Sequence, residues 1–217
     1  MPHPILYSFR RCPYAMRARM VIAIANTPVR LREILLKDKP AEMLAASPKA
    51  TTPVLIDGDE IIDESLAVMA WALARNDPEG WLENFGGNEE LIAENDGPYK
   101  HHLDRYKYAT RYEGEDPIEH RSAGFEFLQK LEARLESAPY LSGDRRGFAD
   151  IAIFPFIRQF RIPDMEWFDA APLPNLQKWL SGLMGSELFT SVMKKYPTWK
   201  ESGEEFLFPE SNATSRA

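Results

Sequence analysis

The hydrophobic periodicity of the chain changes after Arg75. Up to that residue, short apolar runs typical of strands alternate with segments whose apolar residues recur at helical spacing. The expected elements are a strand over 5–9, a helix over 13–25, a strand over 29–35, a short helix over 40–46, a hairpin over 53–57 and 60–62, and a helix over 64–74. This order combines a parallel crossover with an antiparallel hairpin, so it predicts a mixed α/β layer rather than a helical bundle.

The remainder of the chain shows helical spacing and no convincing alternation. Residues 76–88 contain turn-forming residues at both ends and are expected to form a linker. Residues 200–217 are polar and are expected to form a loosely held tail. The sequence therefore predicts two domains, an α/β domain over residues 1–76 and an all-α domain over residues 88–217.

Charge is distributed unevenly along the chain. The whole sequence contains 26 Lys and Arg against 33 Asp and Glu, a net charge of −7 that argues against nucleic-acid binding. Residues 1–75 hold 10 basic and 8 acidic residues, a net of +2, and residues 1–19 hold four arginines and no acid. No uninterrupted apolar run approaches the length needed to span a bilayer, the longest being Leu66–Ala74, and no secretory-type apolar stretch opens the chain. We therefore expect a soluble, cytoplasmic protein without a membrane partner.

The single cysteine, Cys12, lies where the first expected strand passes into the first expected helix. Pro13 suits the first helical position, which places Cys12 at the N-cap, where unpaired backbone N–H groups favour an anion. Because arginines flank it as well, we expect part of Cys12 to be thiolate at neutral pH, and the thiolate is the nucleophilic form. A lone cysteine is more often a small buried hydrophobe, but this strand–turn–helix setting favours a functional one.

Ala15 stands where a second cysteine would complete a Cys-x-x-Cys motif. One cysteine excludes an internal disulfide and a thiolate zinc cage. A mixed disulfide formed at Cys12 would need an external thiol for its release, and glutathione is the obvious small cellular thiol. The histidines, at positions 3, 101, 102 and 120, show no metal-ligand spacing, and the adjacent His101 and His102 are expected to point to different faces of a helix. No metal site is predicted.

The segment over residues 7–19, Tyr-Ser-Phe-Arg-Arg-Cys-Pro-Tyr-Ala-Met-Arg-Ala-Arg, resembles the active-site segment of cysteine-type glutathione transferases, especially the omega class. Segments over 37–40, 51–55 and 62–65 agree with this family, as does the run 141–152 in the helical half. The resemblance covers residues 4 to about 195. It implies a thioredoxin-like domain followed by a helical bundle, assembled as a homodimer.

The resemblance also implies how glutathione is bound. Cys12 would form a mixed disulfide with the glutathione sulfur. The backbone of Thr52 would bind the cysteinyl part, and Pro53 would be the cis-proline of the fold, since an X–Pro bond takes the cis form at low cost.

Three further residues would bind the charged ends of the tripeptide. Glu64 and Ser65 would hold the γ-glutamyl end at the first turn of a helix, where free N–H groups favour a carboxylate. Lys39 would lie near the glycyl carboxylate. The alternatives are plain helix capping for Glu64 and Ser65, and a solvated surface side chain for Lys39.

A pocket for the second substrate is expected between Cys12 and the first helices of the all-α domain. Its candidate walls are Phe9, Tyr14, Tyr106, Tyr108 and Phe160. The aromatic stripe over residues 99–112 is more often core or dimer interface, which is the competing interpretation for Tyr106 and Tyr108. Two other positions bear on structure: Tyr7 is expected to be structural rather than catalytic, and Gly147 stands where the family often has a capping Ser or Thr.

The resemblance implies a glutathione-dependent thioltransferase or reductase acting on a small electrophile or disulfide. Candidate substrates are glutathionylated thiols, dehydroascorbate and S-glutathionyl ketones, with glutathione as co-substrate. The alternative is a non-catalytic binding or regulatory module of the same fold. Such relatives usually lack the cysteine and the acid–serine pair, so the presence of Cys12, Glu64 and Ser65 disfavours that alternative.

Overall fold

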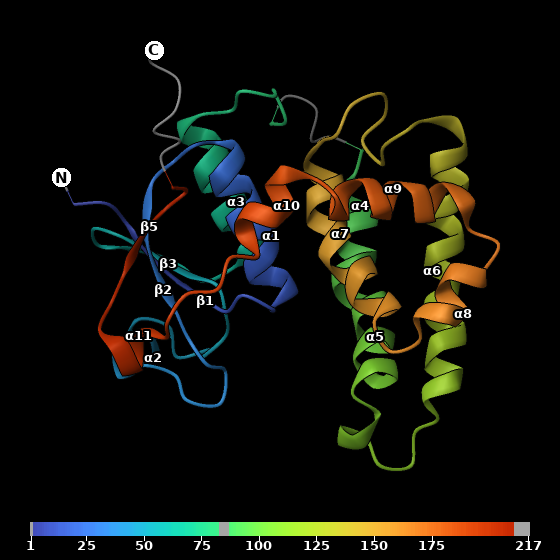
Figure 1. Cartoon of the computed structure of the whole chain (residues 1–217), viewed down its shortest axis with the longest axis horizontal. Helices are drawn as coiled ribbons and strands as arrows, with labels where there is room; N and C mark the ends of the chain where they lie inside the picture. Colours follow the sequence, from blue (N-terminus) through green and yellow to red (C-terminus); the bar gives the residue numbers. More distant parts are fainter. Residues whose placement is uncertain (1, 83–86, 211–217) are drawn as a thin grey trace. The chain divides into compact units, whose positions relative to one another are not determined.

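The computed structural model describes residues 2–82 and 87–210 (Figure 1). The chain divides into two compact units. The first unit contains the residues up to Pro78 and those from Glu187 onward, and the second unit contains Glu79–Ser186. Part of the predicted linker, residues 83–86, and the end of the predicted tail, residues 211–217, lie outside the described residues.

The first unit is built on a five-stranded sheet with strand order β4-β3-β1-β2-β5. The strands are β1 (Ile5–Ser8), β2 (Val29–Glu33), β3 (Val54–Asp57), β4 (Glu60–Ile62) and β5 (Phe206–Phe208). β1 pairs with β2 in parallel, with Leu6 opposite Leu31, and the other neighbours are antiparallel. Gly58, at φ +61°, makes the tight turn between β3 and β4. The predicted mixed α/β layer is therefore confirmed.

Successive side chains of β1 point to opposite faces of the sheet, and each face has its own helices. On one face, Ser8 receives a hydrogen bond from Arg19 of α1 (Pro13–Ile24), which packs against α3 (Ser65–Arg75). On the other face, Tyr7 packs with Met43 of α2 (Ala41–Ala46) and with Trp199 of α11 (Trp199–Ser202). Tyr7 is buried and its hydroxyl accepts a 2.6 Å hydrogen bond from Arg32, as expected of a structural residue.

The C-terminal part of the chain returns to the first unit, which differs from the predicted boundaries. α10 (Glu187–Val192) packs on α1, and β5 joins the sheet beside β2 (Figure 1). Phe208 is 2% exposed, so the expectation of a loosely held tail from residue 200 is wrong for this strand. The three-residue strand is too short for its periodicity to stand out, and its partner lies far away in the sequence.

The second unit is helical, as predicted. Its helices are α4 (Glu89–Glu94), α5 (Lys100–Lys107), α6 (Pro117–Ser137), α7 (Phe148–Arg161), α8 (Met165–Ala170) and α9 (Pro174–Met184). A π-helical segment over Asn95–Tyr99, which contains Pro98, joins α4 to α5, and a 3₁₀ turn over Ala109–Arg111 follows α5. Most of α7 is buried, so it forms the centre of this unit. The predicted fold class, a thioredoxin-like domain followed by an all-α domain, is confirmed.

The start of α7 is held by the buried carboxylate of Asp150. It accepts hydrogen bonds from the backbone N–H groups of Leu141, Ser142 and Gly147 at 2.8, 3.2 and 2.9 Å, and from the indole of Trp179 at 2.7 Å. Gly147 is the N-cap residue, and a Cβ atom there would lie 2.5 Å from the hydroxyl oxygen of Ser142. Glycine is therefore not merely a weak cap here, because the side chain of Ser142 occupies the space beside it.

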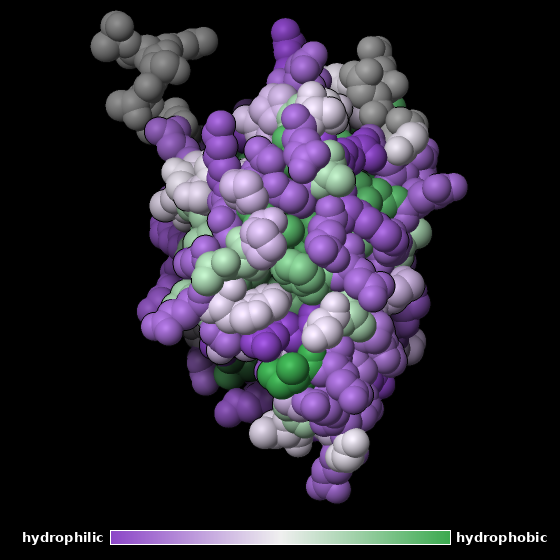
Figure 2. Space-filling view, turned by 90° about the vertical axis from the view of Figure 1, so that its right-hand side faces the viewer, coloured by the Kyte–Doolittle hydropathy of each residue, from purple (hydrophilic) through white to green (hydrophobic). Residues whose placement is uncertain are grey.

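The molecular surface is mainly hydrophilic on the face shown in Figure 2, where hydrophobic residues appear in patches between hydrophilic ones. Large exposed hydrophobic residues of the second unit include Ile118, Ile162 and Met165. Single exposed apolar side chains of this kind are ordinary on folded proteins. Within residues 2–82 and 87–210, no helix has both the length and the apolar character needed to cross a bilayer.

Candidate functional site

Cys12 is the N-cap residue of α1, as predicted, and is half-buried. Its backbone is extended, with φ −72° and ψ 125°, and Pro13 occupies the first turn of the helix. The thiol makes no capping hydrogen bond to α1. Its Sγ atom lies 3.6 Å from the carbonyl oxygen of Thr52, to which the thiol donates. The sulfur therefore faces the segment before β3, at the positive end of a helix.

A buried arginine and a buried glutamate hold the loop that leads to Cys12. Arg19 donates to the hydroxyl of Ser8 at 2.5 Å and to the carbonyl of Arg10 at 2.7 Å, and Glu33 accepts from the backbone N–H of Arg10 at 2.7 Å. Burial lowers the pKa of Arg19 to about 10, although the negative charges of Glu33 and of an ionised Cys12 act in the opposite direction. Burial likewise raises the pKa of Glu33 above its ordinary value, against the hydrogen bond from Arg10. Arg19 and Glu33 thus fix the backbone of the segment that precedes Cys12.

Thr52 and Pro53 lie beside Cys12, as the resemblance implied. The peptide bond between them is cis, so the predicted cis-proline is confirmed. Thr52 is 6% exposed, and its carbonyl oxygen is already engaged by the thiol of Cys12. The backbone of this residue is therefore within reach of anything bound at the sulfur.

Ser65 begins α3, with Glu64 as its N-cap residue. The hydroxyl oxygen of Ser65 accepts two hydrogen bonds from Arg17, from Nε at 3.0 Å and from Nη2 at 2.9 Å. Arg17 is only 1% exposed and its guanidinium lies over the ring of Tyr14, 5.0 Å from the centroid. One arginine of α1 therefore connects a candidate pocket residue to a candidate glutathione-binding residue.

Glu64 takes part in a small charged cluster on the surface. Its carboxylate pairs with Lys49 at 2.7 Å, and Lys49 also pairs with Asp63 at 3.0 Å. The hydrogen bond from Ser47 and the one from Lys49 keep the pKa of Asp63 below its ordinary value. Glu64 makes no side-chain capping bond to α3. The alternative that the side chain of Glu64 merely caps α3 is thus not supported. Its carboxylate lies near the N-terminus of that helix.

Lys39 is partly exposed and donates to the carbonyl oxygen of Leu36 at 2.7 Å. This bond lies within the turn between β2 and α2. The partner of Lys39 in this hydrogen bond is a backbone carbonyl oxygen rather than an acidic side chain. The bond does not connect Lys39 to Cys12 or to Ser65.

The five aromatic candidates for the substrate pocket differ in burial. Phe9 and Tyr14, in the first unit, are partly exposed, with Arg11 over the ring of Phe9. Tyr108, in the second unit, is also partly exposed and stacks with Arg111 at 4.2 Å.

Phe160 and Tyr106 belong to the core of the second unit. Phe160 is fully buried, and the rings of Tyr106 and Tyr99 lie 4.9 and 5.6 Å from it. A Cβ atom on Gly124 would meet Phe160 at 2.7 Å, which shows how closely α6 approaches. Phe160 therefore has no surface for a ligand, and the expectation that it lines the pocket is corrected to a packing role.

Sequence reasoning missed the supporting role of Arg17, Glu33 and Lys49. The signal for Arg17 and Arg19 was the group of arginines without acids in residues 1–19, which we interpreted as charge flanking Cys12. Both side chains are instead buried and hydrogen bonded to residues of other elements. The partners lie up to 48 positions away, and local spacing carries no information about them.

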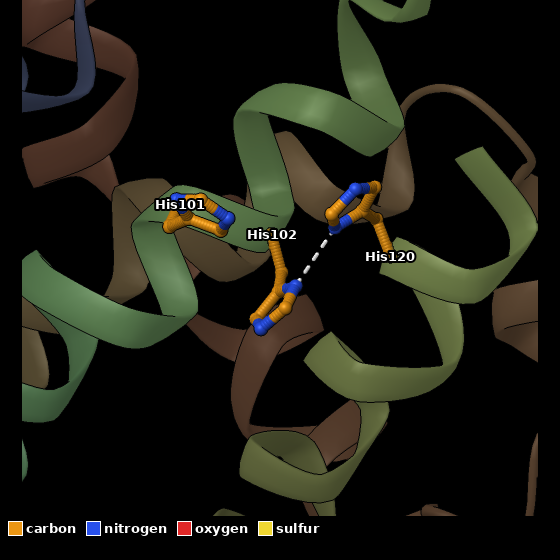
Figure 3. A group of neighbouring side chains, drawn as sticks. All are labelled: His101, His102 and His120. Atoms are coloured by element: carbon orange, nitrogen blue, oxygen red, sulfur yellow. Dashed lines mark hydrogen bonds between the residues drawn. The ribbon is translucent and has the colours of Figure 1, made fainter. Parts of the chain in front are cut away.

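The second unit brings three histidines together (Figure 3). The rings of His101 and His102 lie 5.1 Å apart, and Nδ1 of His102 lies 2.8 Å from Nδ1 of His120. The rings of the adjacent His101 and His102 thus lie close together, and the third ring comes from the start of another helix, α6.

A thioredoxin-like sheet with a cis-proline before β3, followed by a helical domain, is the architecture that the resemblance to glutathione transferases implies. A model described as "Glutathione S-transferase, N-terminal domain" matches residues 6–80 and one described as "Glutathione S-transferase, C-terminal domain" matches residues 79–181. Together these models cover most of the chain. The chain belongs to the glutathione S-transferase family.

Plant proteins are among its curated relatives. The probable glutathione S-transferase parA of Nicotiana tabacum is 27% identical over 209 residues, which is 89% of each chain. Glutathione S-transferase U19 of Arabidopsis thaliana is 25% identical over 211 residues, again 89% of each chain.

Solved structures of the same fold cover the chain similarly. Glutathione S-transferase-I bound with lactoylglutathione is 24% identical, with a TM-score of 0.71 over 88% of this chain and 98% of that one. A Pseudomonas fluorescens family member with two glutathione bound is 18% identical, with a TM-score of 0.74 over 88% of this chain and 92% of that one. At these identities the likeness concerns the fold.

Proposed function

We propose that this chain is a glutathione-dependent thioltransferase of the cysteine type, with Cys12 as its nucleophile. The observation that carries the proposal is the position of Sγ, at the positive end of α1 and 3.6 Å from the backbone of Thr52. The thiolate is the nucleophilic form of a cysteine, and the unpaired backbone N–H groups of a helix N-terminus suit an anion. Arg19, which is buried, holds the loop before Cys12 through Ser8 and the carbonyl oxygen of Arg10.

The proposed reaction has two exchange steps. The thiolate of Cys12 attacks the glutathione sulfur of a mixed disulfide between glutathione and a substrate thiol. The sulfur–sulfur bond of that disulfide breaks, and the substrate leaves as a thiolate that takes a proton from water. A second glutathione, as its thiolate, then attacks the glutathione sulfur bound to Cys12. Oxidised glutathione leaves and the thiolate of Cys12 is regenerated.

The glutathione moiety would be positioned by residues on three elements. The backbone of Thr52, beside cis-Pro53, would bind the cysteinyl part next to Cys12. Ser65 would donate its hydroxyl proton to the γ-glutamyl carboxylate, because Arg17 already donates twice to its oxygen. Glu64 would pair with the α-ammonium group, and Lys39 with the glycyl carboxylate. Relatives solved with glutathione or lactoylglutathione bound support glutathione as the ligand class.

The test compares Cys12→Ser with the parent in the reduction of a glutathionylated peptide by glutathione. We expect the substitution to abolish reduction, since a serine hydroxyl cannot form the mixed disulfide. Mass spectrometry of the parent incubated with oxidised glutathione should find glutathione attached to Cys12. Tyr7→Phe is the matched control. Tyr7 is close to Cys12 in the sequence but is buried, so this variant should retain the activity. Full activity of Cys12→Ser would overturn the proposal.

Conjugation of glutathione to an aromatic halide is expected to be weak in the parent and higher in Cys12→Ser. The cysteine thiolate competes for the glutathione sulfur, whereas conjugation requires glutathione itself to remain a free thiolate. The predicted pocket walls Phe9, Tyr14, Tyr106 and Tyr108, the homodimer and the cytoplasmic location stay predictions.

A further inference from the structure

The three histidines of the second unit form a compact group of nitrogen donors. His101 and His102 lie at the start of α5, and His120 lies near the start of α6 (Figure 3). One ring nitrogen from each residue lies within 4.8 Å of the other two. His102 and His120 are partly buried, and His101 is exposed. The group spans two helices of one compact unit, so the packing of α5 against α6 sets its geometry.

The hydrogen bonds of His120 leave a lone pair on its Nδ1 atom, on the side of the other histidines. Its Nε2 atom lies 2.7 Å from the carboxylate of Glu115, which can only accept, so Nε2 carries a proton. In the neutral ring the other nitrogen, Nδ1, is then a lone pair, and it lies 2.8 Å from Nδ1 of His102. A carboxylate bound to the remote nitrogen of a histidine is the usual support of a metal-ligating imidazole. Arg105, which pairs with Glu115 at 2.6 Å, fixes the carboxylate in turn.

The separation of the nitrogens is close to what a metal ion needs. Tetrahedral Zn–N bonds of about 2.0–2.1 Å place ligand nitrogens about 3.3 Å apart. The 2.8 Å separation of His102 and His120 must open slightly, and the exposed His101 must rotate inward. His102 changes tautomer on binding: its proton moves from Nδ1 to Nε2, and Nδ1 becomes a donor atom. No proton is gained or lost by the three rings together.

We propose that His101, His102 and His120 bind a divalent transition-metal ion of the zinc class, which links α5 to α6. Imidazole ligands suit zinc, copper and nickel, and three of them leave a fourth position for water. Arg105 and Glu126 act on His102, and the carboxylate of Glu115 pairs with His120 at 2.7 Å. The three histidines belong to the second unit, whereas Cys12 and the residues proposed to bind glutathione belong to the first.

Zinc is the probe for the test, with calorimetry on the full-length chain carrying Cys12→Ser so that no thiolate competes for the metal. We expect one zinc ion per chain and a higher thermal midpoint in its presence. His102→Gln and His120→Gln should each lose the site. Glu115→Gln should weaken binding by about 10–100-fold, as is typical of a lost carboxylate partner. His3→Gln is the matched control and should bind zinc as the parent does.

The visible absorption spectrum of bound Co²⁺ shows whether the histidines are its ligands. The Co²⁺-loaded chain should show the visible bands of a tetrahedral site with nitrogen and oxygen donors, and these bands should be absent in His120→Gln. Circular dichroism without metal must match between the variants and the parent, and Glu115→Gln, altered at an exposed side chain, serves if a histidine variant does not fold. Absence of zinc binding by the parent chain, or undiminished binding by both His102→Gln and His120→Gln, would overturn the proposal.

Discussion

Arg17 and Arg19 are two residues apart on α1, and each supports a different side of the candidate site. Arg19 holds the loop before Cys12 through Ser8 and the carbonyl of Arg10. Arg17 donates twice to the hydroxyl oxygen of Ser65. Burying a guanidinium is costly unless its hydrogen bonds are met, so both side chains are held in place by these partners. The consequence for Ser65 is that its own proton is left to donate to a ligand.

Arg17→Lys should therefore raise KM for glutathione while leaving kcat nearly unchanged. Lysine keeps the charge but loses the planar fork that fixes the hydroxyl of Ser65. The loss of one hydrogen bond to a charged group, about 1.5 kcal/mol, corresponds to roughly a tenfold rise in KM. Steady-state kinetics with glutathione as the varied substrate measures both constants. Arg75→Lys, in the last turn of α3, is the matched control, and an equal rise in both variants would contradict this role of Arg17.

The beginning of α7 is stabilised by its third residue and by the preceding loop rather than by its N-cap side chain. Asp150 receives three backbone N–H groups and the indole of Trp179, which together fix the segment 141–147 onto the helix. The hydroxyl of Ser142, which is buried and makes no hydrogen bond within the described chain, fills the space that a Cβ atom of residue 147 would need. The backbone of Gly147, at φ −139°, is one that any residue can adopt, so the constraint is purely steric.

Gly147→Ser should destabilise the protein even though serine is the better N-cap residue. The new Cβ atom would lie 2.5–2.6 Å from the side chain of Ser142, and overpacking of this kind costs about 1–3 kcal/mol. The double variant Ser142→Gly with Gly147→Ser removes the clash and should recover most of that loss. The free energies of unfolding in urea of the parent, both single variants and the double variant complete the cycle. A double variant no more stable than Gly147→Ser would contradict the steric explanation.

For the molecule as a whole, the two compact units are not two consecutive halves of the chain. The segment from Glu187 onward contributes α10, which packs on α1, and β5, which extends the sheet beside β2. Glu205, next to β5, pairs with Arg30 and Arg32 of β2 at 2.9 and 3.0 Å. The first unit therefore depends on residues from both ends of the sequence.

A chain that ends at Ser186 should lose the stability of the first unit and keep that of the second. Without β5 the edge of β2 is unpaired, and without α10 part of α1 is exposed. Hydrogen exchange should show faster exchange in β1, β2 and α1 than in the full chain, with α6 and α7 still protected. Unchanged protection of β2 would contradict the prediction.

Two substitutions in the full-length chain separate the packing of β5 from a general effect of shortening. Phe208 is 2% exposed and Leu207 is 45% exposed. Phe208→Ala should cost about 3 kcal/mol by leaving a cavity, whereas Leu207→Ala should cost less than about 1 kcal/mol. Equal effects of the two substitutions would mean that β5 contributes little through packing.

Elements that depend on residues close together in the sequence agree closely with the sequence-based predictions. α1 begins at Pro13, the hairpin turns at Gly58, and Pro53 is cis, each within a residue or two of the expected position. The prediction failed at the partners of particular side chains: Arg17 with Ser65, Lys49 with Glu64, and His102 with His120. It also failed at β5, whose pairing with β2 joins distant parts of the chain.

The hydrophobic periodicity and the positions of proline and glycine were sufficient to infer an α/β part and an all-α part of the chain. They also indicated the helix that starts after Cys12 and the hairpin, because these features depend on contacts between residues a few positions apart. The burial of Phe160, the filled space at Gly147 and the meeting of three histidines depend on which faces of separate helices pack together. That choice is made by the summed packing of the whole unit, so no short segment of sequence contains it.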